Sequence, residues 1–200
     1  MAIHDDWIST KQVWGQLSFP VKVFLGITLL ANLMSGFSLL SQVTALSGFI
    51  LEGYKFYMAL TEPIRDVIGN WISMPRAIFD TLVIALTIQG AVLRARAFSA
   101  YKDYVALFCA IGLFVVWAFT AAMNHLYDRT WLASLEEYLF FTFIGVSVFA
   151  PLIIGWLPYN RESVEYSIER LTSGYILGLA ILIGALGAIS KGLQQGFGIG

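Results

Sequence analysis

The chain has 200 residues, of which 58% are hydrophobic and only 12% are charged, and its formal net charge is −1. Soluble globular domains carry about 25% charged residues, so this composition excludes an ordinary soluble domain. Nucleic-acid binding is also disfavoured, because it requires clustered lysine and arginine. Uncharged stretches of about 20 residues, the length with which a helix crosses a bilayer, recur along the chain. We therefore expect an all-α, polytopic helical integral membrane protein with four to five transmembrane helices and short interfacial amphipathic helices.

Five hydrophobic segments are candidate spans of a single transmembrane domain that covers residues 1–200. In chain order they are 20–44, 76–94, 104–124, 138–157 and 172–190. Pro151 lies within the fourth segment, where the missing backbone donor predicts a bend. The number of spans and the short connections leave no room for a separate soluble domain.

Two further segments have an apolar face and a polar face, and we expect them to lie in the membrane interface. They are 1–19, where Trp7, Val13, Trp14 and Leu17 recur at helical spacing, and 63–73, which follows Pro63. The stretch 47–60 between the first span and Pro63 has two interpretations. It either extends the first span or forms a re-entrant segment shielded from lipid by protein.

The aromatic and basic residues support these borders and suggest an orientation. Five of the six tryptophans fall at predicted borders, as is typical of the headgroup region. With 95–103 in the cytoplasm, seven of the twelve lysines and arginines lie inside, which is a small bias. We expect a multi-pass protein of the bacterial inner membrane.

Metal, cofactor and catalytic signatures are missing from the sequence. His4, His125 and Cys109 are the only histidines and cysteine, whereas zinc requires about four nitrogen or sulfur ligands at suitable spacing. The G-x-S-x-G, H-E-x-x-H and phosphate-loop motifs do not occur. We therefore expect no metal, no cofactor and no catalytic residues, and the protein is predicted not to be an enzyme.

The densest polar cluster lies between the third and fourth spans and includes Asn124 and His125. His125 is a candidate sensor or proton relay, but a solvated helix end is the favoured interpretation of the cluster. An enzyme would require His125 with Asp128 or Glu136 as acid and base, and we rank this interpretation last.

Asp80 is the acid closest to an apolar run, and an ionisable group in a span is a functional candidate. Arg76 lies four residues earlier on the same helical face, so an Arg76–Asp80 ion pair is the favoured interpretation. The alternative is a small transporter or permease in which Asp80, Gln89 and Asn124 contact a solute.

A polar stripe occupies one face of the first span, because its members alternate at spacings typical of a helix. It consists of Thr28, Ser35, Ser38 and Gln42. Lipid is a poor partner for such a face, so we expect it to contact another helix, with a wet lumen as the alternative.

The last span carries small residues at nearly every fourth position. They are Gly174, Gly178, Ala180, Gly184, Ala188, Gly192 and Gly196. Small side chains let helices approach closely in lipid, so we expect this stripe to pack against a helix of this chain or of other copies arranged around an axis.

These features lead to one expected function and two alternatives. We expect a non-enzymatic, homo-oligomeric membrane protein that acts as a channel-like or membrane-sensing scaffold subunit. Its expected partners are the lipid bilayer, copies of itself and a protein at the cytosolic face, but no nucleic acid. A small transporter is the first alternative and a membrane-embedded enzyme the second.

Overall fold

The computed structural model describes residues 14–15, 18–42, 46–98, 104–156 and 167–197, which form helices joined by short connections and contain no strand. The helices are α2 (Phe19–Ser41), α3 (Gly48–Gly69), α4 (Arg76–Phe98), α5 (Val105–Tyr127), α6 (Thr130–Ile144), η1 (Gly145–Phe149), α7 (Ala150–Trp156) and α8 (Ser167–Phe197). The all-α fold class is confirmed.

Five of these segments are long and apolar enough to cross a membrane. They are Phe19–Ser41, Arg76–Leu93, Leu107–Tyr127, Thr130–Ile153 and Arg170–Gly192. Each overlaps one of the five expected spans. The fourth includes α6 and the π-turn η1, and it starts earlier than expected because the link after α5 is only two residues, Asp128 and Arg129. Asp128 adopts the left-handed conformation that reverses the chain there (φ 45°).

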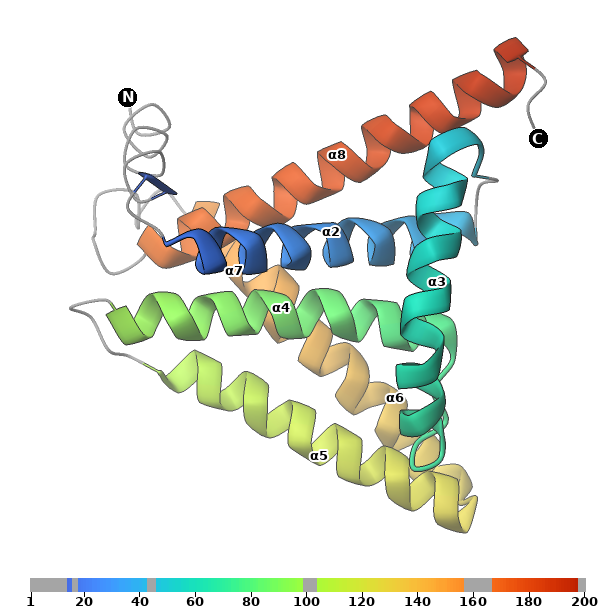
Figure 1. The fold of residues 1–200 in the computed structure, drawn as a ribbon. Helices are drawn as coiled ribbons and strands as arrows, with labels where there is room; N and C mark the ends of the chain where they lie inside the picture. Colours follow the sequence, from blue (N-terminus) through green and yellow to red (C-terminus); the bar gives the residue numbers. More distant parts are fainter. Residues whose placement is uncertain (1–13, 16–17, 43–45, 99–103, 157–166, 198–200) are drawn as a thin grey trace.

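In Figure 1, α2 and α4 run side by side, α8 and α5 diverge from them toward one end, and α6 with α7 crosses obliquely behind. Helix α3 crosses the end toward which α8 and α5 diverge (Figure 1). We call this end the α3 face. The chain arrives there at the ends of α2, α5 and α8, and it leaves there at the starts of α4 and α6. Among the spanning elements, α2 packs on α4, α5 packs on α6 and α7 packs on α8.

Helix α3 corrects two expectations of the sequence. The interfacial helix expected over 63–73 is longer, because one helix runs from Gly48 to Gly69 and contains Pro63 in its interior. The stretch 47–60 is neither an extension of the first span nor re-entrant, since its helical part is the first half of α3. The turn before it requires a positive φ of 59° at Gly48, which glycine adopts without strain.

The other interfacial helix, expected over 1–19, lies mostly outside the described residues. Within that segment, Trp14 and Gly15 are helical, and Phe19 begins α2. The amphipathic stretch 160–171 is likewise described only from Ser167, where α8 begins.

A π-helical segment, η1, lies just before Ala150 and Pro151, in the segment where the sequence predicts a bend. Pro151 has no N–H to donate to the carbonyl of Ser147, four residues earlier. That carbonyl lies within η1, and the Gln89 side-chain amide of α4 donates to it over 3.5 Å, at the long limit of a hydrogen bond. An amide from a neighbouring helix thus partly replaces the missing donor, as is common for proline in membrane helices.

Two glycines allow α2 and α8 to approach each other near the α3 face. Gly36 of α2 faces the side chain of Ile183, and a Cβ atom at that position would clash with it. Gly187 of α8 faces Leu40, where an added Cβ would lie 2.6 Å from the Leu40 Cδ2 atom. Close approach of helices at small residues is the usual packing mode in lipid.

Candidate functional site

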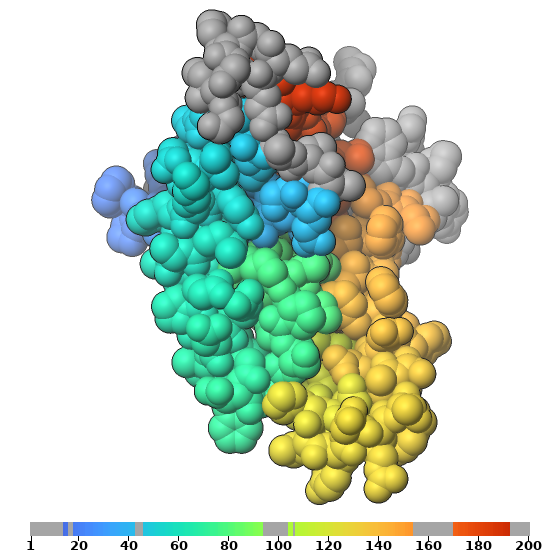
Figure 2. Space-filling model, turned by 90° about the vertical axis from the view of Figure 1, so that its right-hand side faces the viewer, coloured from blue at the N-terminus to red at the C-terminus, as the bar shows by residue number. Residues whose placement is uncertain are grey.

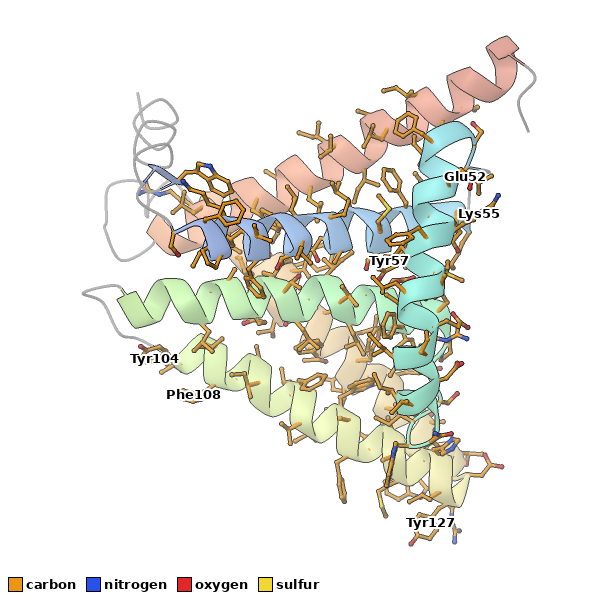
Figure 3. All side chains as sticks on the ribbon, viewed as in Figure 1. Glu52, Lys55, Tyr57, Tyr104, Phe108 and Tyr127 are labelled. Carbon is orange, nitrogen blue, oxygen red and sulfur yellow. The ribbon has the colours of Figure 1, made fainter. Side chains whose placement is uncertain are left out.

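The side of α3 that faces the bundle carries a tyrosine which connects three helices. The Tyr57 hydroxyl lies 2.6 Å from Ser35 Oγ of α2 and donates to Asp80 Oδ1 of α4 over 3.0 Å. Figure 3 shows Tyr57 on the bundle side of α3, with Glu52 and Lys55 on the opposite side. Because Ser35 and Asp80 are fully buried, this hydroxyl is the polar joint between α3 and the spanning helices.

The predicted Arg76–Asp80 ion pair is confirmed, and it extends further than the sequence indicated. Arg76 Nε donates to Asp80 Oδ2 over 2.9 Å. The Arg76 guanidinium carbon lies 4.9 Å from the ring centroid of Tyr57, within cation–π range, and Nη1 is 3.7 Å from Glu62 of α3. Ser35, Tyr57, Glu62, Arg76 and Asp80 therefore form one group, which we call the α3 joint.

Burial keeps the Tyr57 hydroxyl protonated. It raises the pKa of Tyr57 to about 12, mainly because the phenolate would lose its hydration, and the nearby Asp80 carboxylate adds to the effect. At neutral pH the hydroxyl is therefore a hydrogen-bond donor, as its contact with Asp80 requires.

The outward faces of α3 suit the membrane surface. Its exposed apolar residues recur at helical spacing, and they are Phe49, Phe56, Leu60, Ile64 and Val67. Glu52 and Lys55 lie away from the bundle and form an exposed ion pair of 2.8 Å. Figure 2 views the α3 face and shows α3 along one side of it, beside the ends of α2 and α4. A helix with one face on protein, one apolar and one charged fits the boundary between lipid and water.

A second polar group lies deeper in the bundle, between α2, α4 and α8. Asn32 is fully buried, and its side-chain amide donates to the Tyr175 hydroxyl over 2.6 Å. The Thr87 hydroxyl lies 2.7 Å from Asn32 Oδ1 and 2.8 Å from the Val83 carbonyl, and it can donate its proton to only one of them at a time. All three residues are among those that line a cavity of about 380 Å³.

The rest of the cavity is mainly apolar. Its walls include Leu25, Leu29 and Ile88 together with Thr28 and Thr172, and none of the described residues that line it is charged. Leu29 is 41% exposed and Tyr175 is 36% exposed, so the cavity opens at the surface of the described bundle, between α2 and α8.

The predicted polar stripe of α2 divides into two parts. Ser35 and Ser38 are buried among helices, as the packing interpretation expects. Thr28 lines the cavity and donates to its own helix at the Phe24 carbonyl, while Gln42 is exposed and follows the end of α2. The stripe therefore packs against other helices near the α3 face and lines an open cavity further along α2.

The polar cluster between α5 and α6 behaves mainly as a helix junction. The Asn124 amide donates to Glu136 Oε2 over 2.8 Å and connects the two helices, whereas His125 is exposed. Groups of three or more metal-ligating side chains do not occur within the described ranges. Asp80, Gln89 and Asn124, named for a transporter, take part in three separate contacts and not in one site.

Four glycines of the predicted α8 stripe have open space around them in the described part of the chain. A Cβ atom added at Gly174, Gly178, Gly184 or Gly192 would meet no atom within 4 Å. Ala180 and Ala188 are exposed, and the side-chain position of Gly196 lies outside the described residues. Within the chain, α8 is approached instead at Gly187, which the predicted stripe did not include. The packing of this stripe against other copies stays a prediction.

The sequence analysis did not single out Asn32, Tyr57 or Tyr175, because each lies in an apolar or amphipathic helix without a neighbouring motif. It also did not predict a contact outside the two polar groups, in which the Ser47 N–H donates to Ser190 Oγ over 2.8 Å across 143 residues of sequence. A signal was available for Asn32 alone, since an amide in a span usually marks a helix contact.

Comparison of the chain with protein-family models, with curated proteins and with solved structures finds no match. The class of protein therefore follows from the fold, whose five apolar helices and crossing amphipathic helix define a polytopic helical integral membrane protein.

Proposed function

We propose that this protein is a non-enzymatic, membrane-sensing scaffold subunit in which α3 responds to the bilayer surface and the spanning helices receive the response. The observation that carries the proposal is the α3 joint. Tyr57 and Glu62 of α3 meet Ser35 of α2 and the Arg76–Asp80 pair of α4. A shift of α3 changes these contacts directly.

The physical reasoning rests on the different surroundings of α3 and its partners. The exposed apolar stripe of α3 rests on lipid, so its depth depends on headgroup packing and bilayer thickness. The joint contains a buried ion pair whose geometry is specific. When α3 moves slightly, one or two polar contacts of the joint break, because the joint cannot deform gradually. Contacts that are either made or broken give two distinct states, as a switch requires.

The distance between α3 and the bundle in bilayers of different thickness tests this proposal. Spin labels are placed at K55C on α3 and V116C on α5, in a C109A background, and pulsed electron resonance is recorded in nanodiscs of 14-carbon and 22-carbon phosphatidylcholine. We expect the distance distribution to shift between the two lipids. The matched pair V116C and Y138C, on α5 and α6, reports the rest of the bundle and should not shift. An unchanged α3 distance, or equal shifts in both pairs, would rule out α3 as the sensing element.

The scaffold part of the proposal is homo-oligomerisation through α8. It is supported by the open surroundings of Gly174, Gly178, Gly184 and Gly192, because such a face gains close contact only from a partner helix. Native mass spectrometry after extraction in mild detergent should show an oligomer for the unmodified protein and a smaller species for G184L. A monomer in both detergent and lipid nanodiscs would remove this part of the proposal.

A further inference from the structure

We infer that the cavity between α2, α4 and α8 is a binding site for an uncharged hydrophobic molecule that carries a carbonyl group, taken up from the bilayer. This inference is independent of the proposed sensing function, because none of the residues of the α3 joint lines the cavity. Its volume of about 380 Å³ lies at the lower end of the range of small-molecule sites.

The walls determine that the ligand is hydrophobic and uncharged. Leu25, Leu29 and Ile88 are among its walls, and none of the described residues that line it carries a charge. An ion or a carboxylate would lose its hydration there without a compensating charge. The exposure of Leu29 on the spanning helix α2 gives the proposed access from lipid.

The polar side chains in the lining favour a ligand that carries a carbonyl group. The Tyr175 hydroxyl accepts a hydrogen bond from the Asn32 amide, and within the described part of the chain no acceptor is found for its own proton. Asn32 is fully buried and holds this hydroxyl in position. A donor facing an apolar space is satisfied by a ligand oxygen that accepts without donating, which a ketone, a quinone or an ester provides.

Photolabelling with a matched pair of probes tests the inference. The first probe is a nine-carbon alkyl diazirine with one ketone, and the second has the same chain without the ketone. Each is titrated into the full-length protein in nanodiscs, and labelled peptides of α2, α4 and α8 are quantified by mass spectrometry. We expect saturable labelling by the ketone, with a half-saturation concentration about fivefold lower than for the alkane, as one net hydrogen bond provides. Excess nonan-2-one should compete.

Variants separate the role of Tyr175 from a general effect on folding. Y175F keeps the ring and removes the donor, so the half-saturation concentration of the ketone should rise about fivefold while alkane labelling is unchanged. Y138F, at an exposed tyrosine of α6 outside the cavity, should alter neither probe. A91W fills the cavity from α4 and should abolish labelling by both. Equal half-saturation of the two probes, or an unchanged ketone titration in Y175F, would overturn the inference.

Two lipid compositions identify the source of the carbonyl. In nanodiscs of ester-linked phosphatidylcholine a lipid carbonyl competes for the site, whereas ether-linked phosphatidylcholine has none. A higher half-saturation concentration for the ketone in ester lipid assigns the site to a membrane lipid. Equal values assign it to a separate hydrophobic molecule. Both results uphold the site, while labelling of the cavity peptides that does not saturate in either lipid would refute it.

Discussion

Two halves of the bundle are stabilised by different interactions. The α5–α6 half is packed by aromatic rings, with centroids of Phe114 and Phe143 5.6 Å apart and those of Trp117 and Phe140 5.7 Å apart. The half formed by α2, α3, α4 and α8 has an apolar cluster of its own around Phe37, but buried hydrogen bonds from Asn32 to Tyr175 and from Tyr57 to Asp80 also connect its helices. Ring packing tolerates small shifts because many weak contacts share the energy, whereas a polar contact is either made or broken. Both the proposed sensing and the proposed ligand binding are therefore assigned to this half.

The largest effect is expected from removing one member of the buried ion pair. D80L should destabilise the protein by about 4 kcal/mol, because the buried Arg76 loses its 2.9 Å partner and keeps only Glu62 at 3.7 Å. The double variant R76M/D80L should recover most of this loss, since both charges are then gone. Unfolding in a graded mixture of mild detergent and dodecyl sulfate measures the difference. Equal destabilisation of the single and the double variant would show that the loss of stability does not come from the unpaired charge of Arg76.

A cavity in the α5–α6 half should reduce the stability of the protein somewhat less than D80L does, and it should not move α3. W117A removes a ring that is 1% exposed and should destabilise the protein by about 3 kcal/mol. This value is near the lower limit for such truncations, because burying a side chain away from lipid, unlike water, gains no hydrophobic free energy. W131A, at a position 65% exposed, is the matched control and should be nearly neutral in the same assay. A change in the K55C to V116C distance in W117A would contradict the independence of the two halves.

The two small-residue faces of α8 should respond in opposite ways to the same substitution. G187L should destabilise the subunit by about 2 kcal/mol through overpacking, because the added side chain meets Leu40. G184L, three residues away, has open space within the subunit and should preserve its stability while reducing oligomer formation. Unfolding and native mass spectrometry on both variants distinguish the two outcomes. Equal loss of subunit stability would mean that both faces pack within the chain.

The smallest loss of stability is expected from removing the Tyr57 hydroxyl of the α3 joint. Y57F should destabilise by about 1 kcal/mol, since interhelical hydrogen bonds in lipid contribute little individually. Because burial raises the pKa of Tyr57 to about 12 from 10.0, the neutral hydroxyl favours the folded state. This contribution is fully present below pH 10 and is lost as the pH rises through about 12. The unmodified protein should therefore lose stability faster than Y57F between these values, and parallel pH profiles would contradict this.

Local patterns were sufficient to predict the spans and the Arg76–Asp80 contact. Length and hydropathy are properties of a continuous segment, and the bilayer requires backbone groups to be satisfied within that segment. An i, i+4 pair likewise depends on one helix alone. Helix α3 was predicted only in part, because the residues before Pro63 are apolar enough to resemble a continued span, and only the tertiary structure shows that they cross the ends of α2 and α4.

The sequence by itself thus determined an all-α membrane protein with five apolar helices, since these depend on neighbours in the chain. Only the tertiary structure decided which polar groups meet: Asn32 bonds to Tyr175 across 143 residues, and Ser35 meets Tyr57 across the turn into α3. It also decided that Gly187, and not Gly184, packs within the subunit. Such contacts depend on the rotation and height of one helix relative to another, which are set by the packing of the whole bundle.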